Sequence, residues 1–167
     1  MSRAFVDWLE KLKESQSWTA ARATLRRSLA FAPGAYPPAF PYVEAFVREE
    51  GWQREAHYLV AALYALKDGA HQEGRTLARA LKEAERARDS KSVERRFLAL
   101  LDADRDQIAF RLRQAVGLVE GGLDFAQLLE DLLRWFDPRR RVQARWAREY
   151  YGVREEQTQE GIEEVKA

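Results

Sequence analysis

The side chains with the clearest capacity for chemistry in this sequence are its arginines. Of 28 basic residues, 22 are Arg and 6 are Lys. From Gly74 onward, a helical pattern places Arg75, Arg79, Lys82 and Arg86 at i, i+4, i+7 and i+11. At about 100° per residue these four lie within a sector of roughly 60°. Like charges at i,i+4 destabilise a helix by about 0.2–0.5 kcal/mol, so helix formation does not require this row. Because guanidinium groups bind phosphate through paired hydrogen bonds, the row points to a polyphosphate ligand.

Further basic residues recur on other predicted helices. They are Arg22, Arg26, Arg27, Arg111, Arg113, Arg139, Arg140, Arg141, Arg145 and Arg148. One interpretation is a set of solvated faces whose charges pair with Glu83, Glu85, Glu94 and Glu149. The recurrence of several basic patches in one small chain favours phosphate binding instead. Because no base-reading helix is recognisable, we expect contact that does not depend on nucleic-acid sequence.

Catalytic and metal-binding patterns are weak by comparison. The two histidines, His57 and His71, lack the spacing of a metal pair, and the chain has no Cys. The run Asp102–Asp106 resembles the start of a calcium loop, but position six is Gln107 and position twelve is Arg113, where such a loop has Gly and Glu. We therefore expect no enzyme, no cofactor and no metal site.

Composition indicates an ordinary globular protein, with 46% hydrophobic and 33% charged residues. The net charge is +1, and residues 153–167 carry five acidic and two basic residues, a net charge of −3 that leaves +4 on residues 1–152. We expect residues 1–152 to form one domain, with a lobe boundary near 68–74 as an alternative, and residues 153–167 to be a frayed acidic tail. The charged N-terminus does not resemble a signal peptide, and the lack of Cys favours a cytoplasmic protein.

Apolar residues repeat with helical spacing nearly everywhere, and no segment of strand length alternates with a period of two. We predict an all-α fold, a compact helical bundle of about eight or nine helices, with two helical lobes as an alternative. Two helices are expected before residue 30, and others are expected at 42–50, 53–67, 75–88, around Phe97, at 105–120, at 125–136 and from Pro138 onward. Asp104, Asp124 and Asp137 are the expected N-caps. Four of the five prolines lie in residues 32–41, which cannot be helical throughout.

The five Trp residues fall on or next to apolar helical faces. A Trp in that position packs into a core more often than it serves as a platform for nucleobases. We therefore expect the tryptophans to be structural.

Several segments of the chain match one protein family. The matching segments are Gly74–Leu81, Glu94–Leu101, Gln107–Val116, Asp124–Leu129, Asp131–Trp135 and Trp146–Tyr150, with looser matches at Trp8, Leu25–Arg27, the proline-rich loop and Gly51–Trp52. With these residues the sequence resembles the small subunit of the type I-E CRISPR surveillance complex, Cascade, which is called the CasB family. The resemblance covers nearly the whole chain before the acidic tail.

The resemblance implies a non-enzymatic, all-helical protein that binds neither membrane nor small-molecule substrate. In the family, two copies stack head to tail along an RNA-guided complex. The implied partners are the backbone and large subunits, a second copy of the chain, the guide RNA and the target DNA, above all its displaced strand. Matched residue by residue, the basic positions of the family fall on Arg26, Arg27, Arg54, Arg113 and Arg139–Arg141. The alternative is a structural adaptor whose basic faces bind acidic surfaces of partner subunits.

Overall fold

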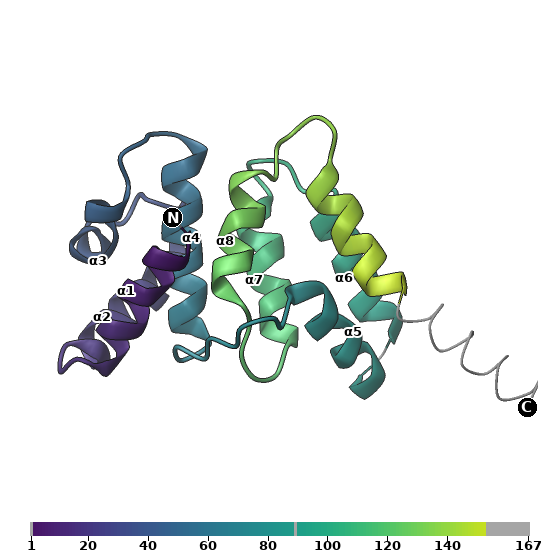
Figure 1. The fold of residues 1–167 in the computed structure, drawn as a ribbon, viewed down its shortest axis with the longest axis horizontal. Helices are drawn as coiled ribbons and strands as arrows, with labels where there is room; N and C mark the ends of the chain where they lie inside the picture. The colour runs from purple at the N-terminus through teal and green to yellow at the C-terminus, as the bar shows by residue number, and fades with distance from the viewer. Residues whose placement is uncertain (1, 89, 153–167) are drawn as a thin grey trace, which may run out of the picture.

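The computed structural model describes residues 2–88 and 90–152, and within them the chain forms helices and no β-strand (Figure 1). The elements are α1 (Ser2–Glu14), α2 (Trp18–Arg27), η1 (Ser28–Ala30), η2 (Pro37–Ala39), α3 (Phe40–Val43), η3 (Glu44–Phe46), α4 (Trp52–Leu66), α5 (Leu77–Ala87), α6 (Ser90–Leu101), α7 (Ile108–Leu118) and α8 (Phe125–Leu133). A further helix covers residues 141–152. The predicted all-α bundle is confirmed. The predicted acidic tail lies outside the described residues.

Helix α4 is the centre of the molecule. Every residue from Ala56 to Ala65 is buried, as expected for a helix that is apolar around most of its circumference. Helices α2, α3, α7 and α8 pack against α4. In Figure 1, α1–α4 form the left half, α5, α6 and the last helix form the right half, and α7 and α8 lie between them. Buried apolar side chains of both halves belong to one cluster. The domain limit at residue 152 stays a prediction.

Residues 68–74, the alternative lobe boundary, form backbone hydrogen bonds with the segment that follows α7. The Gln72 amide donates to the Leu123 carbonyl at 2.9 Å, and the Leu123 amide donates to the Ala70 carbonyl at 3.1 Å. Arg75 Nη1 donates to the carbonyl oxygens of Glu120 and Gly122 at 2.8 and 2.6 Å. These bonds join the two halves of the sequence beside the core.

A pair of glycine substitutions tests this junction. A Cβ on Gly122 would collide with the Ala70 carbonyl oxygen and lie 3.0 Å from its carbonyl carbon, so Gly122→Ala is expected to lower the free energy of unfolding by about 1–3 kcal/mol. Gly117 is exposed in the last turn of α7 with open space beside it. Gly117→Ala is expected to raise the free energy of unfolding by up to about 0.5 kcal/mol, less than in a helix interior. Urea unfolding measures both, and changes of the same sign would contradict this description.

The helix predicted at 42–50 is wrong. The chain forms one short α-helical turn, α3, then the 3₁₀ turn η3, and leaves helical geometry at Val47. The cause is a contact from a distant helix. A continued α-helix would bond the Tyr42 carbonyl to the Phe46 amide, but this carbonyl accepts from Trp8 Nε1 at 2.9 Å. Phe46 instead packs against Phe5 and Trp8.

Two predicted helix starts are also wrong. Asp104 does accept hydrogen bonds from the backbone amides of the two residues before α7, at 3.0 and 3.1 Å, but it caps a turn and α7 begins only at Ile108. Asp137 likewise accepts from the Arg139 amide within a turn, at 3.1 Å. The last helix begins at residue 141 because Arg140 has a φ of 53°, which is left-handed and incompatible with a right-handed helix.

Other local predictions are confirmed. Asp124 caps α8 by accepting from the Gln127 amide at 2.9 Å. Trp135 and Trp146 are fully buried and meet edge to face, with ring centroids 5.0 Å apart. The remaining tryptophans are half-buried against the core. Among the described residues, none of the helices has the length and apolar character to span a bilayer.

Candidate nucleic-acid interface

Three predicted basic residues lie near the point where η1, which follows α2 directly, meets α7. Arg26 and Arg27 occupy the last turn of α2, are exposed, and form no ion pair with any described residue. Arg113 lies on the exposed side of α7, and its Nη1 donates to the Leu29 carbonyl at 3.4 Å. A neutral carbonyl partner leaves the charge of Arg113 uncompensated. The end of α2 and the exposed side of α7 therefore both present positive charge to solvent, and Leu29 of η1 joins the two elements.

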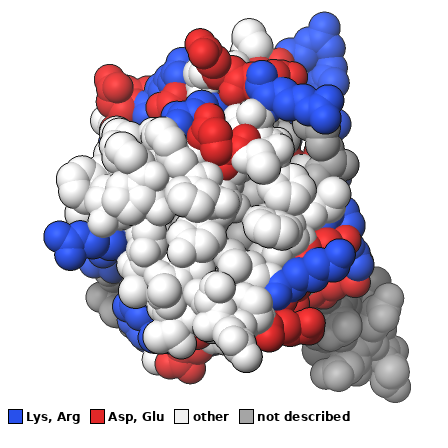
Figure 2. All heavy atoms as spheres, turned by 90° about the vertical axis from the view of Figure 1, so that its left-hand side faces the viewer, with Lys and Arg blue, Asp and Glu red and all other residues white. Residues whose placement is uncertain are grey.

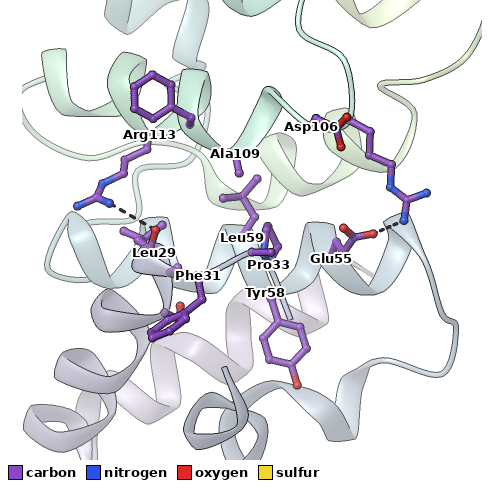
Figure 3. Close-up of a pocket in the computed structure, with 14 residues that line it drawn as sticks. Leu29, Phe31, Pro33, Glu55, Tyr58, Leu59, Asp106, Ala109 and Arg113 are labelled. Carbon is purple, nitrogen blue, oxygen red and sulfur yellow. Dashed lines mark hydrogen bonds and ion pairs between the residues drawn. The ribbon is translucent and has the colours of Figure 1, made fainter. Parts of the chain in front are cut away.

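Beside these residues lies a cleft of about 350 Å³ between the α2–η1 end, α4 and α7. Leu59, Ala62 and Ala109 contribute apolar surface to it. In Figure 3, Arg113 reaches toward Leu29 on one side of the cleft, and Glu55 and Asp106 lie on the other. Arg105 also lines the cleft and forms an ion pair with Glu55. The cleft therefore has a cationic side and a side that carries both signs of charge.

The Arg139–Arg141 run contacts the end of α6, and the turn that follows α6 leads to the cleft. Arg140 Nη2 donates to the carbonyl of Leu101, the last residue of α6, at 2.6 Å. A cation at a helix C-terminus is favourable because it compensates the helix dipole. Arg139 and Arg141 flank this anchor, are exposed, and form no ion pair with a described residue. The turn after Leu101 carries Arg105, which lines the cleft.

The row expected on α5 is not a continuous basic surface, because two of its four members are used within the fold. Arg75 bonds Glu83 at 2.6 Å as well as the two carbonyls near Gly122. Lys82 is buried, with Nζ 3.4 Å from Glu85 and 4.9 Å from the ring centroid of Tyr150. The last helix therefore covers the part of α5 that we expected to face solvent.

The other two members of the row, Arg79 and Arg86, are exposed and form no ion pair within the described part of the chain. Glu83 lies between them on the exposed side of α5 and interrupts the positive surface. Helix α5 packs against α6 and α7 in the right half of Figure 1, away from α2. These two arginines form a separate patch from the cleft.

Arg145 and Arg54 are also committed to internal contacts. Arg145 forms ion pairs with Asp131, which is almost fully buried, and with Glu149. Arg54 bonds both carboxylate oxygens of Glu44, at 3.2 and 3.1 Å, and the Gly34 carbonyl at 3.0 Å. Its guanidinium carbon lies 5.0 and 4.8 Å from the ring centroids of Phe40 and Tyr58. Arg54 therefore fastens the proline-rich segment to α4. Four of the basic residues expected to bind nucleic acid are thus paired with carboxylates of this chain, namely Arg54, Arg75, Lys82 and Arg145.

The Arg54 contact also changes the acid titration of the protein. The hydrogen bond from Arg54, and then that from the Tyr58 hydroxyl, lower the pKa of Glu44 below its ordinary value of 4.5. A carboxyl group with a lowered pKa in the folded state stabilises the fold above its unfolded pKa. That contribution is lost as the pH falls from about 4.5 through the folded pKa.

We therefore predict that Glu44→Gln lowers the free energy of unfolding at neutral pH by up to about 1 kcal/mol, because the partly exposed ion pair is lost. The variant should also lose less stability than the wild type between pH 4.5 and more acidic solution. Urea unfolding at several pH values measures both effects. Glu49→Gln, at an exposed carboxylate nearby, is the matched control and should follow the wild type. Identical acid dependence in all three proteins would contradict the assignment.

The sequence interpretation missed the exposed aromatic residues at the cleft. Phe110 is 65% exposed and Phe31 is 48% exposed, and both line the cleft. The signal for Phe110 was present, because the inward residues of α7 include Ile108 and Leu112, and Phe110 falls about 200° from each on the helical wheel. It also missed Arg95 and Arg96, which are exposed on α6.

Both histidines have contacts within the fold. His57 is buried, and its Nδ1 donates to the Gln53 carbonyl at 2.7 Å. His71 Nδ1 accepts from the Phe125 amide at 3.2 Å. Among the described residues, no three His, Asp or Glu side chains are grouped in a way that could hold a metal ion.

One face of the molecule has little charge. Figure 2 views the left side of Figure 1, where α1, α2 and α3 lie, and shows a broad uncharged surface with Lys, Arg, Asp and Glu at its margins. Residues 28–43, which connect α2 to η3, contain no charged residue. Their exposed members include Phe31, Pro37, Pro38 and Pro41. This uncharged segment adjoins the cleft, since its members Ser28 and Pro33 line the cleft.

Comparison with known proteins gives consistent matches. The family model described as CRISPR-associated protein Cse2 matches residues 21–151. The CRISPR-associated protein Cse2 of Thermus thermophilus is 72% identical over 152 residues, which is 89% of each chain. The crystal structure of CasB from Thermus thermophilus matches with a TM-score of 0.84 and 71% identity, over 90% of this chain and 97% of that one.

More distant structures match over a similar length. CasB from M. ruber has a TM-score of 0.75 and 37% identity, over 94% of this chain and 96% of that one. A chain of a CRISPR RNA-guided surveillance complex has a TM-score of 0.76 and 26% identity, over 96% of each chain. Because the family model matches residues 21–151 and a relative is 72% identical over 152 residues, the chain belongs to the Cse2 family of CRISPR-associated proteins, also called CasB.

Proposed function

We propose that this chain is a non-catalytic small subunit of the type I-E surveillance complex, Cascade, and that it stabilises opened target DNA by binding the backbone of the displaced strand. Its likeness to a chain of a CRISPR RNA-guided surveillance complex supports the place in the assembly. The observation that carries the binding role is a set of exposed guanidinium groups that form no ion pair with a described residue. Arg113 lines one cleft, and Arg26 and Arg27 directly precede Ser28, which lines the same cleft. The partners would be the backbone and large subunits, a second copy of the chain, the guide RNA and the target DNA.

The mechanism follows from charge. Pairing with the guide reads the target sequence, and exchanging a DNA duplex for an RNA–DNA duplex is nearly balanced in free energy. Cations along the displaced strand lower the free energy of the open state, so modest contacts shift the balance. Arginine contacts to phosphate position a strand without reading its bases. Weak contacts suffice because the rest of the complex holds the strand close by.

The proposed path starts at Arg26, Arg27 and Arg113, follows the cleft, and continues past Arg105 to the exposed Arg139 and Arg141. Arg140 would position this turn through its bond to the end of α6. Arg79 and Arg86 on α5 would form a second patch for nucleic acid or for a neighbouring subunit. We assign Arg54, Arg75, Lys82 and Arg145 to the fold, because their charges are met by carboxylates of this chain.

A second candidate function is that of a structural adaptor. The uncharged face in Figure 2 and the exposed Phe31 and prolines of residues 28–43 favour it, because exposed apolar side chains are typical of a protein–protein contact. In this case partner subunits would cover residues 28–43, and the arginines would pair with acidic groups of those subunits. Both functions can coexist if the strand and the partner use different faces.

Binding of single-stranded DNA as a function of salt tests the proposed function. Fluorescence anisotropy of the full chain with two labelled strands of unrelated sequence would give Kd at a series of salt concentrations. We expect a slope of log Kd against log salt of about 0.7 per phosphate contact, hence about 2 or more for three contacts. The slope and the affinity should be the same for both strands. Affinity that is independent of salt, or confined to one sequence, would contradict the proposal.

A further inference from the structure

The cleft beside Arg113 contains more than a phosphate site requires. A phosphate contact needs cations alone, yet this cleft combines apolar surface from α4 and α7 with two exposed aromatic rings. Phe31 stacks on Tyr36, with the rings 7° from parallel and their centroids 4.8 Å apart, so Phe31 is supported from behind. Phe110 is 65% exposed, the most exposed of the large apolar side chains among the described residues. Leaving such rings in water is unfavourable unless a ligand covers them.

Charge in the cleft is distributed to match a nucleotide. Arg113 supplies positive charge on one side, where Ser28 and Leu29 follow directly after the exposed Arg26 and Arg27. On the other side Arg105 neutralises Glu55, while the carboxylate of Asp106 is exposed. Figure 3 shows Arg113 and Asp106 on opposite sides with Leu59 and Ala109 between them. The Asp106 carboxylate repels phosphate, so the phosphate of a bound nucleotide would lie on the Arg113 side of the cleft.

We propose that this cleft takes up one unstacked nucleobase of a single strand, with Phe110 and Phe31 covering the base and Arg113 contacting the adjoining phosphate. This inference rests on the proposed function and adds a base-binding subsite to the backbone contacts. A volume of about 350 Å³ is at the lower end of the range of roughly 300–1,000 Å³ typical of small-molecule sites. It therefore suits a single base and not a stacked run of bases.

A cleft of this kind would accept any of the bases, so it would not read the sequence of the strand. Stacking on an aromatic ring is available to every base, because each has a π face. The apolar lining excludes water from the base, and an exposed phosphate stays at the rim near Arg113. An apolar peptide would also fill the cleft, but it would leave the adjacent guanidinium groups without a partner of opposite charge.

The test compares two labelled single strands of equal length and equal charge, one with bases and one made of abasic phosphodiester units. Anisotropy titration at low salt measures Kd of each strand for the full chain. The wild type is expected to bind the base-containing strand about fivefold or more tightly, as stacking of one base predicts. Phe110→Ala should remove this preference and leave Kd for the abasic strand unchanged, whereas Phe110→Trp should retain it. Leu98→Ala, at an exposed apolar residue of α6 outside the cleft, should behave as the wild type.

The outcomes separate this inference from the function on which it rests. Salt-dependent binding of both strands with equal Kd, and no effect of Phe110→Ala, would overturn the base subsite and retain the backbone contacts. Lack of binding to either strand at low salt would overturn both. Unchanged strand binding together with failure of Phe110→Ala to join its partner subunits would assign the cleft to a protein contact and would also overturn the base subsite.

Discussion

Changing Arg26, Arg27 and Arg113 together to Gln will lower the salt dependence of single-strand binding by about 2 in the slope of log Kd against log salt. Each of the three side chains is expected to neutralise one phosphate, and each contact contributes about 0.7 to the slope. At low salt, Kd should rise about tenfold or more, since a charge-assisted hydrogen bond contributes about 1.5–3 kcal/mol. The loss should be the same for unrelated strand sequences. Anisotropy titrations over a series of salt concentrations measure both quantities.

The matched control changes the same number of exposed arginines elsewhere. Arg48→Gln, Arg95→Gln and Arg96→Gln alter the net charge by the same three units at exposed positions outside the cleft. If binding depended only on the total charge, both triple variants would lose affinity equally. That result would contradict a localised interface. If neither variant lost affinity for DNA but the first failed to assemble with its partner subunits, the adaptor function would be favoured.

Asp131→Ala is expected to lower the free energy of unfolding by about 3–5 kcal/mol, the largest stability effect that we predict. The Asp131 carboxylate is almost fully buried and forms an ion pair with Arg145. It also accepts from Trp146 Nε1 at 2.7 Å and from Gln127 Nε2 at 2.9 Å. Removing it leaves the buried indole N–H of Trp146 and the Gln127 amide without this acceptor, and it leaves Arg145 with Glu149 as its remaining ion-pair partner. Urea unfolding followed by tryptophan fluorescence measures the loss.

The neighbouring residue provides the control for this substitution. Glu130 is 42% exposed, and its only ion pair, among the described residues, is with Arg134 at 4.0 Å. Glu130→Ala should change the free energy of unfolding by no more than about 0.5 kcal/mol, because an exposed pair contributes little. The prediction for Asp131 is refuted if the two variants differ by less than about 1 kcal/mol.

The helices that could be predicted from the sequence are those whose apolar pattern and cap agree. Asp124 caps α8, and the inward residues of α8 are those that the spacing indicates. The helix predictions that were wrong concern segments in which a side chain forms a hydrogen bond with a backbone carbonyl of an element distant in sequence. Trp8 removes the Tyr42 carbonyl from the helix that we expected at 42–50. Arg140 adopts a left-handed φ in the turn where it reaches the end of α6, and this delays the last helix. Local spacing carries no information about such contacts.

The candidate site was predictable in part, for a similar reason. A helical wheel identifies which residues of α5 share a face, but not whether another helix covers that face. Tyr150 of the last helix packs over Lys82, and Arg75 pairs with Glu83, so half of the row is unavailable to a ligand. Arg26, Arg27 and Arg113 could be named from sequence, but their relation in space depends on the contact of η1 with α7. The cleft could not be predicted, because its lining residues come from segments that are distant in the sequence.

The central claim is that fixed guanidinium groups at the cleft hold a displaced strand through its phosphates. The lifetime of opened target DNA in the assembled surveillance complex tests this most directly, with either the wild-type subunit or the Arg26→Gln, Arg27→Gln, Arg113→Gln variant present at equal occupancy. The account predicts a shorter lifetime with the variant, and a difference that diminishes as salt increases. An equal lifetime at full occupancy of the variant subunit would contradict it.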